Sequence, residues 1–365
     1  MPDLFAVPPI APVSALNSRQ RFAACLAGQP VDRPALWMMR QAGRFLPEYR
    51  AVRQQHTFLE MVHTPELALE VTLQPLRRFG MDAAILFSDI LTIPEALGMN
   101  VDFPEGGPQL SPVIRTAADV ARLPSGDCVE KLDYVGQALK LIRAELPHNY
   151  VLGFSGAPFT LASYMVEGKG TRTFEGIKTL MYQHPQVFHA LMDKLTDSVI
   201  AYLKMQLDAG ADAVQLFDSW AGELRAEEYV EHVLPSTQRI IQAVHAHGGK
   251  LLLFARHTGH LLDASLRSGA NGLGLDSRID LASAAAKAKA VGMAVQGNLD
   301  PIELFAPPAH IHARVREMAA ATKGCGWIAN LGHGVIPSTP IAGVEALVSA
   351  VHGLATNSQG GSLHS

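Results

Sequence analysis

Eight short apolar runs punctuate the sequence, and segments with helical periodicity separate them. The runs cover residues 35–39, 82–89, 150–154, 212–218, 250–254, 272–276, 293–297 and 327–330. Parallel strands need long crossover connections, which are usually helices, so this alternation predicts an α/β fold with a parallel sheet inside a layer of helices. Eight repeats favour a single-domain (β/α)8 TIM barrel, with the active site at the C-terminal ends of the strands.

The helical segments also suggest where the domain begins and ends. Asn17 or Ser18 caps a first helix that ends before Gly28, and later helices are expected at about 65–79, 130–146, 185–209, 227–246, 261–268, 281–290, 311–322 and 341–354. We therefore expect a flexible N-terminal arm (1–16), the barrel (17–356) and a disordered Gly/Ser-rich tail (357–365). The polar, glycine-containing segment 164–176 is expected to be a mobile loop that could serve as a lid.

Composition narrows the classes of partner. The chain has 365 residues, of which 48% are hydrophobic and 18% charged, with a net charge of −4. This balance describes a globular protein with a large core and gives no reason to expect nucleic acid as a partner. No signal peptide and no apolar run of about 18 residues is present, so no membrane partner is expected. Three widely spaced cysteines without a CxxC pair fit a cytoplasmic protein.

Four arginines lie close together just after the first apolar run. They are Arg40, Arg44, Arg50 and Arg53. A guanidinium group stays charged and presents a planar fork of donors that matches carboxylates or phosphates. Several on one loop suggest a site for a substrate with several negative charges. The alternative, for the cluster taken alone, is a solvated basic turn.

Polar residues follow the other apolar runs as well. Asp89 follows the second run, Tyr164 lies a little beyond the third, Ser219 follows the fourth and His333 follows the eighth. Each has a structural alternative: Asp89 could cap the next segment, Tyr164 could be a core aromatic, and His333 could face solvent. Ser219 lies in FDSWAG, which is not a GxSxG nucleophile motif.

Three further strand-end residues have no assigned chemistry. Asp218 could simply orient a loop. His257 and His260 are three residues apart, but no cysteine or glutamate set accompanies them, so no metal site is predicted there.

The segment WMMRQAGRFLPEYR at 37–50 resembles the WxMRQAGRxLPEYR signature of the uroporphyrinogen decarboxylase family. GAPFTLASYMVEG (156–168), QLFDSWAG (215–222), QGNLDP (296–301) and NLGHGVIPSTP (330–340) support the resemblance, which extends from about residue 17 to 354. It implies a homodimeric barrel that removes the four acetate carboxyls of uroporphyrinogen III without a cofactor or metal, giving coproporphyrinogen III. The substrate-contacting positions that it implies are Arg40, Gln41, Ala42, Gly43, Arg44, Arg53, Asp89, Tyr164, Ser219 and His333.

Within that resemblance, Asp89 is expected to stabilise a ring cation, and Arg40, Tyr164 and His333 are candidate proton donors. Arg50 is expected to be structural. The chain departs from the family at 254–260, where a glycine-rich turn is commoner, and at Ser277, where tryptophan is commoner. Two alternatives stay open: a zinc-dependent methyltransferase of the same superfamily, and a tetrapyrrole carrier without chemistry.

Overall fold

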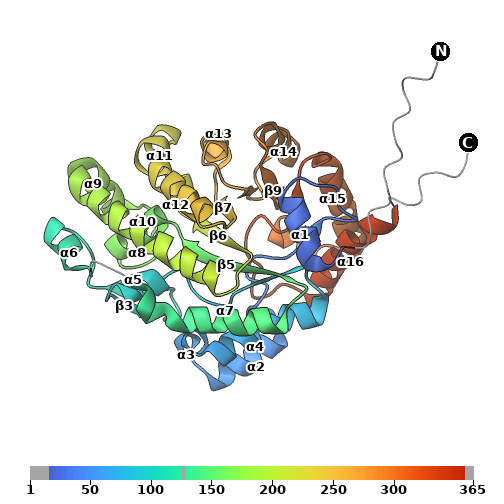
Figure 1. The fold of residues 1–365 in the computed structure, drawn as a ribbon, viewed down its shortest axis with the longest axis horizontal. Helices are drawn as coiled ribbons and strands as arrows, with labels where there is room; N and C mark the ends of the chain where they lie inside the picture. The colour runs from blue at the N-terminus through green and yellow to red at the C-terminus, as the bar shows by residue number, and fades with distance from the viewer. Residues whose placement is uncertain (1–15, 125–127, 358–365) are drawn as a thin grey trace, which may run out of the picture.

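The computed structural model describes residues 16–124 and 128–357, and within this part eight parallel strands form one sheet. Its order is β1-β10-β9-β8-β7-β6-β5-β2, and helices surround it (Figure 1). The strands are β1 (Ala35–Leu36), β2 (Ala83–Ile85), β5 (Tyr150–Gly156), β6 (Ala213–Asp218), β7 (Leu251–Ala255), β8 (Gly272–Gly274), β9 (Ala294–Gln296) and β10 (Trp327–Ala329). The predicted TIM barrel is confirmed.

The barrel closes between β1 and β2 without a regular ladder of backbone bonds. The Asp82 N–H donates to the Leu36 carbonyl over 2.8 Å, and the Asp82 carboxylate accepts the Leu36 N–H over 2.9 Å. Nearer the C-terminal end, the fully buried side chain of Gln41 accepts the Met38 N–H (3.1 Å) and donates to the Ala83 carbonyl (3.0 Å). Side chains therefore satisfy the backbone groups that a ladder would otherwise pair.

A packed core fills the barrel. The Trp37 indole donates to Gln296 over 2.8 Å, and Gln296 donates to Gln215 over 3.2 Å. Residues two apart on a strand share a face, so Phe217 lies directly above Gln215. Its ring meets those of Phe154 and Phe254 edge-on, with centroids 5.7 and 5.8 Å away. These aromatic rings form the floor of the C-terminal mouth.

Each of the nine predicted helical segments contains helical structure, and the described chain has further helices that were not predicted. The helices are α1 (Ser18–Leu26), α2 (Pro47–Gln55), α3 (Phe58–His63), α4 (Pro65–Phe79), α5 (Thr92–Ala96), α6 (Ala117–Arg122), α7 (Asp133–Glu145), α8 (Pro158–Glu167), α9 (Glu175–Gln183), α10 (Pro185–Asp208), α11 (Ala226–His232), α12 (Leu234–Ala246), α13 (Leu262–Leu266), α14 (Leu281–Ala290), α15 (Pro308–Ala321) and α16 (Ile341–Asn357). Asn17 caps α1 with a capping box, and Gly80 ends α4 in the left-handed conformation, as predicted.

Three predicted segments are wrong in detail. The arginine-rich stretch is not a single loop, because its second half forms α2 and carries Arg50 and Arg53 on a helix that begins at Pro47. Tyr164 is helical, since α8 continues to Glu167 and the loop covers only 168–174. The expected helix 227–246 is two helices, because α12 begins afresh at Leu234 with a proline in its first turn.

The connection after β2 is Pro/Gly-rich and still holds regular structure. It contains α5, α6 and a hairpin of β3 (Asn100–Asp102) and β4 (Gln109–Ser111). These elements lie on the left of Figure 1 together with α8 and α9. They extend the rim at the C-terminal ends of the strands, where β2 and β5 release the chain.

Ion pairs hold the opposite end of the barrel. The fully buried Asp82 pairs with Arg21 (2.9 Å) and Arg33 (2.6 Å), and Asp212 pairs with Arg143 at 2.8 Å and with Arg19. Both acids precede strands, so these networks lie at the N-terminal face, where TIM barrels carry residues for stability rather than chemistry.

The predicted N-terminal arm, apart from residue 16, and the tail from 358 onward lie outside the described residues. Among the residues that are described, no helix has the length and apolar character needed to cross a membrane.

Candidate active site

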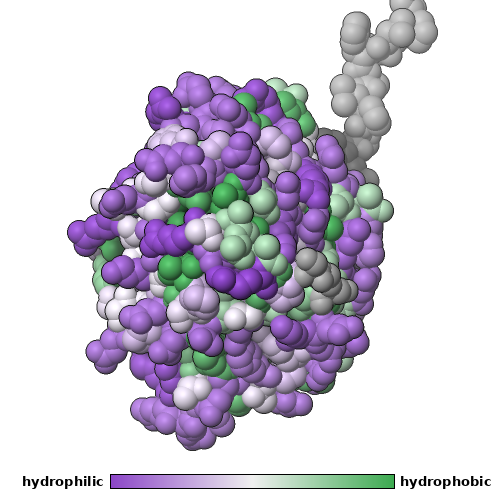
Figure 2. Space-filling model, turned by 90° about the vertical axis from the view of Figure 1, so that its left-hand side faces the viewer, coloured by the Kyte–Doolittle hydropathy of each residue, from purple (hydrophilic) through white to green (hydrophobic). Residues whose placement is uncertain are grey.

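The predicted site residues come from five strand ends around one mouth. Figure 2 views the molecule from the side where α6, α8 and α9 lie, and hydrophobic and strongly hydrophilic surface meet near the centre of that face. In barrel order, Arg40 follows β1, Asp89 follows β2, Tyr164 follows β5, Ser219 follows β6 and His333 follows β10. The parallel strands therefore bring together residues that are almost 300 positions apart in the chain.

Arg40 occupies a strained and electrostatically unusual position. Its φ is 62°, in the left-handed region that non-glycine residues rarely adopt. A Cβ added to Gly334 would lie 2.4 Å from its Cδ, so this glycine leaves room for the arginine. Burial lowers the pKa of the Arg40 guanidinium, while Tyr164 and Asp89 act in the opposite direction. The side chain is nevertheless reachable by solvent, because it lines an open mouth.

Asp89 has the local capping role that its sequence position allowed. One carboxylate oxygen accepts the Leu91 N–H over 2.8 Å and so fixes the turn before α5. Burial raises the pKa of Asp89 to about 6, although the Leu91 N–H and the Arg40 cation favour the charged form. A carboxylate with a raised pKa in a mouth lined by cations is a candidate for chemistry as well as for structure.

Tyr164 lies on α8 beside Trp220, with ring centroids 5.9 Å apart, and Trp220 in turn contacts Phe174 at 5.2 Å. Burial and the nearby Asp89 raise the pKa of the Tyr164 phenol. The hydroxyl therefore keeps its proton at neutral pH and can donate a hydrogen bond into the mouth.

His333 is held neutral. Burial lowers its pKa to about 4, and the cations Arg40 and Arg256 reinforce the shift. At neutral pH the imidazole offers one donor and one acceptor nitrogen instead of a positive charge.

The remaining predicted positions differ in what their side chains can offer. Gln41 uses its side chain to join β1 and β2, so only its backbone is free to meet a ligand. Arg44 is exposed, and its charge reaches Arg40. The Arg53 guanidinium donates to the His56 carbonyl (2.8 Å) at the end of α2. Half-buried positions in the mouth and its first turn are Ala42, Gly43 and Ser219.

Arg50 has the structural role expected of it. Its guanidinium donates to the carbonyls of Arg44 (2.9 Å) and Phe45 (3.1 Å), which holds the loop after β1 against α2. Asp218 is also engaged in local structure, because it accepts the Thr160 hydroxyl over 2.8 Å and Thr160 accepts the Trp220 N–H over 3.2 Å.

Two arginines near the mouth, Arg256 and Arg278, were not among the predicted site residues. Arg256 lies close enough to affect the pKa values of Arg40 and His333, and Arg278 affects that of His257. His257 itself has φ 58°. The signal was present in the departures from the family at 254–260 and at Ser277, but only the barrel geometry shows that these turns face the mouth.

His260 does not join this group. Its imidazole Nε2 donates to the Leu224 carbonyl over 2.8 Å. Across the described part of the chain, no cluster of three or more His, Cys, Asp or Glu side chains is arranged to hold a metal ion.

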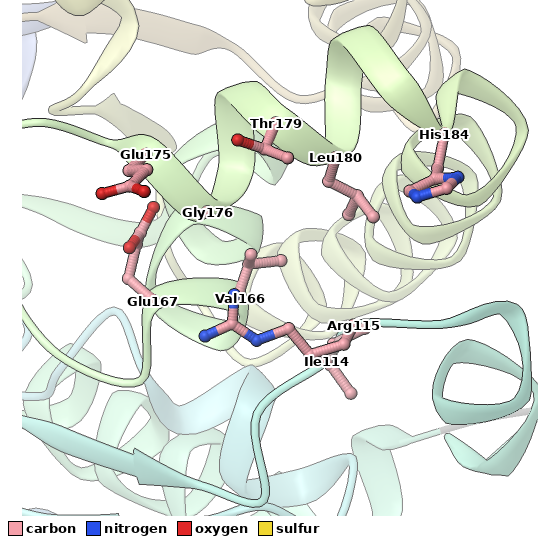
Figure 3. A pocket seen from close by; sticks show the side chains of 9 residues that line it. All are labelled: Ile114, Arg115, Val166, Glu167, Glu175, Gly176, Thr179, Leu180 and His184. Carbon is pink, nitrogen blue, oxygen red and sulfur yellow. The ribbon is translucent and has the colours of Figure 1, made fainter.

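A separate cavity of about 480 Å³ lies beside the loop 168–174 (Figure 3). Its polar lining comes from Arg115, Glu167, Glu175, Thr179 and His184. Glu167 accepts the Ile177 N–H over 3.0 Å and so ties the end of α8 to α9. None of the predicted site residues lines this cavity. The hydrogen bond between Glu167 and Ile177 in its wall holds the two ends of the loop next to Tyr164 together.

Comparison with known proteins identifies the family. The family model described as Uroporphyrinogen decarboxylase (URO-D) matches residues 17–354. Relatives named "Uroporphyrinogen decarboxylase" come from Chloroflexus aurantiacus (47% identical, 91% of this chain and 95% of the relative) and Pseudomonas aeruginosa (47%, 93% and 98%). Another, from Pelobacter propionicus, is 46% identical over 92% of this chain and 98% of its own length.

Among solved structures, a methyltransferase from Methanosarcina mazei superposes with a TM-score of 0.79, at 19% identity over 92% of this chain and 98% of that one. A B12-independent methionine synthase from Shewanella gives 0.55, at 12% identity over 81% and 88%. At such identities these likenesses show a shared barrel fold and nothing about activity. The family match and the relatives at 46–47% identity decide the matter: the chain belongs to the uroporphyrinogen decarboxylase family.

Proposed function

We propose that this protein decarboxylates the four acetate side chains of uroporphyrinogen III to methyls, releasing four CO2 and forming coproporphyrinogen III, with no cofactor. The observation that carries the proposal is the placement of Asp89 beside Arg40 at one mouth of the barrel, in a chain that belongs to this family. One acid among several cations suits a substrate that has many carboxylates around a basic pyrrole core.

The arginines bind the substrate. Arg40 and Arg44 follow β1 and direct their charge into the mouth, and a guanidinium fork can hold a carboxylate with two parallel hydrogen bonds. Arg53 contributes at the outer edge. Gly43 and Ala42 let the backbone of the first turn approach the ring closely, because neither presents a large side chain.

Asp89 stabilises the cationic form of the pyrrole ring. Loss of CO2 leaves an electron pair on the carbon next to a pyrrole, and that pair needs a sink. A proton added to the pyrrole ring carbon makes the ring an iminium-like cation. The C–C bond to the carboxyl then breaks, its electron pair neutralises the ring and CO2 leaves. A second proton, added to the exocyclic carbon, completes the methyl, and loss of the proton first added to the ring carbon restores the aromatic pyrrole. An ionised Asp89 accepts the pyrrole N–H groups and stabilises the cation where it develops.

The proton donor must carry its titrating proton at neutral pH. Arg40 and Tyr164 meet this condition, and burial makes the Arg40 guanidinium a stronger acid than a solvated one. His333 is neutral at that pH, so it better fits a hydrogen-bonding role toward a carboxyl or a pyrrole.

Incubation with uroporphyrinogen III under anaerobic, reducing conditions tests the proposal. The products are oxidised and separated by carboxyl number, and we expect four-carboxyl porphyrin to accumulate. Substrate that binds but keeps all eight carboxyls would support the carrier instead. Stoichiometric zinc in the purified protein, measured by atomic emission, would favour the methyltransferase alternative.

We also propose that the active form is a homodimer in the cytoplasm, with residues 17–356 as its folded unit and the two ends as flexible extensions. Multi-angle light scattering gives the mass directly, and a 39.2 kDa monomer at micromolar concentration would contradict the dimer. Limited proteolysis should trim only the two ends.

A further inference from the structure

The arginines at the two ends of the barrel differ in their partners. At the N-terminal face, Arg19, Arg21, Arg33 and Arg143 all pair with carboxylates. At the C-terminal mouth, the guanidinium groups of Arg40, Arg44, Arg256 and Arg278 make no ion pair and no hydrogen bond with any described residue. Like charges gathered without an ion-pair partner repel one another, so an anion that enters between them is attracted.

These unpaired cations stand on opposite sides of the mouth. In the ring of eight strands, β7 lies four places from β1, which is directly across the barrel. Arg256 follows β7, yet its charge still lowers the pKa of Arg40, which follows β1. The two sides are therefore close enough to act on one ligand.

Hydrogen bonds hold the turns after β7 and β8 in place. The Asp276 carboxylate accepts the N–H of Thr258 (3.0 Å) and that of Arg278 (2.8 Å) and so joins the two turns. The Asn298 amide donates to the carbonyls of Asp276 and Ile279, both at 2.9 Å. His257 is thereby held at φ 58°, a conformation that costs free energy and that persists only where its surroundings enforce it.

We infer that Arg256, His257 and Arg278 form a second carboxylate-binding wall, the β7–β8 wall, which holds the substrate carboxylates that point away from Arg40 and Arg44. The inference rests on the proposed function, since it assigns one more part of the same substrate site. It accounts for a strained histidine and two arginines without ion pairs on the same pair of turns.

Binding of a carboxylate at the β7–β8 wall should also change the protonation of His257. Burial lowers the pKa of His257, Arg256 and Arg278 lower it further, and Asp276 and Glu223 oppose them. The neutral His333 is the other titratable group that faces this side of the mouth. A carboxylate bound between Arg256 and Arg278 offsets their charge, so His257 takes up a proton when the ligand binds.

Binding of two unreactive porphyrins tests the wall: uroporphyrin III with eight carboxylates and coproporphyrin III with four. We expect Arg278→Met and Arg256→Met each to raise the Kd for uroporphyrin about tenfold, which is the effect of losing one charge-assisted contact. Arg278→Lys should recover part of the affinity. In turnover, Arg278→Met should raise KM by a similar factor and leave kcat within about twofold.

Arg316→Met provides a matched control, because Arg316 is an exposed arginine on the outer helix α15 without an ion pair. If both wall variants bind uroporphyrin as tightly as Arg316→Met does, the inference is wrong. Failure of the proposed function looks different: the wild-type protein then leaves uroporphyrinogen unchanged, whatever the variants bind.

Calorimetry in two buffers with different ionisation enthalpies measures the number of protons that the protein takes up when uroporphyrin binds. At pH 7 we expect uroporphyrin binding to take up a fraction of a proton, and His257→Asn to reduce that uptake. Asparagine tolerates the left-handed conformation, so this variant keeps the turn while removing the titrating group. Equal uptake by the wild-type protein and His257→Asn would overturn the role of His257.

Discussion

Gln41 joins the first two strands of the barrel, since its side-chain amide donates to the Ala83 carbonyl over 3.0 Å while its oxygen accepts the Met38 N–H. The same residue stands between Arg40 and Gly43 in the turn that carries the unpaired arginines. The seam of the barrel, where β1 meets β2, and the turn that carries Arg40 and Arg44 therefore share this residue. A change that weakens the seam should also disturb the position of Arg40.

We expect Gln41→Leu to lower the free energy of unfolding by about 2–4 kcal/mol, because it strands a buried N–H and a buried carbonyl. Urea denaturation followed by circular dichroism measures the change. Gln54→Leu is the control, since Gln54 is exposed on α2 and its side chain makes no hydrogen bond with a described residue. Equal midpoints for the two variants would show that the seam does not depend on Gln41.

Asp89→Asn should keep the fold and lose about 100-fold in kcat, because it removes the charge but not the volume of the group that stabilises the ring cation. The wild-type kcat/KM should fall as the pH drops through about 6, where Asp89 gains its proton. That acid limb should be missing from the residual activity of the variant. Near-normal turnover would remove Asp89 from the mechanism.

Gly334→Ala should displace Arg40, because its new Cβ would lie 2.4 Å from the Arg40 Cδ. We expect kcat/KM to fall by about 10- to 100-fold with little change in the melting temperature. Gly106→Ala is the matched control, since nothing lies within 4 Å of the Cβ that it adds. Unchanged kinetics in Gly334→Ala would mean that Arg40 can move without consequence.

Asp218 should make the stability of the protein depend on pH. Burial raises its pKa to about 7, and its second carboxylate oxygen is buried without a hydrogen-bond partner. The folded state then holds a proton that the unfolded chain releases near pH 4, so stability falls as the pH rises from about 4 to 7. Asp218→Asn should flatten that slope in thermal melts across the range. A slope identical to that of the wild-type protein would show that Asp218 is ionised in the folded state.

Local chemistry explains which predictions from the sequence succeeded. The capping signals of α1 and α4 act through neighbouring residues, and the apolar runs need only a buried environment, so the strands and most helices were predictable. The errors fall where tertiary contacts decide. Helix α2 buries only Tyr49 fully, so its sequence lacks the repeated apolar positions that marked the predicted helices.

The site divides in the same way. The strand-end pattern predicted that Arg40, Asp89, Tyr164 and His333 would lie at one face, because parallel strands present their C-terminal ends together. Their assignment to a substrate site came from the family resemblance and stays a prediction. The family could also be recognised from the sequence, because a long contiguous motif needs no structure to detect it.

Only the tertiary structure decided what each charge experiences. Whether His333 is neutral, whether Asp89 holds its proton near pH 6, and whether Arg256 and Arg278 find partners all depend on groups that come from other strands. Burial and Coulomb interactions act over distances in space, not along the chain, so no spacing in the sequence encodes them. The sequence determined which groups reach the mouth of this barrel, and the closure of the barrel determined their charge.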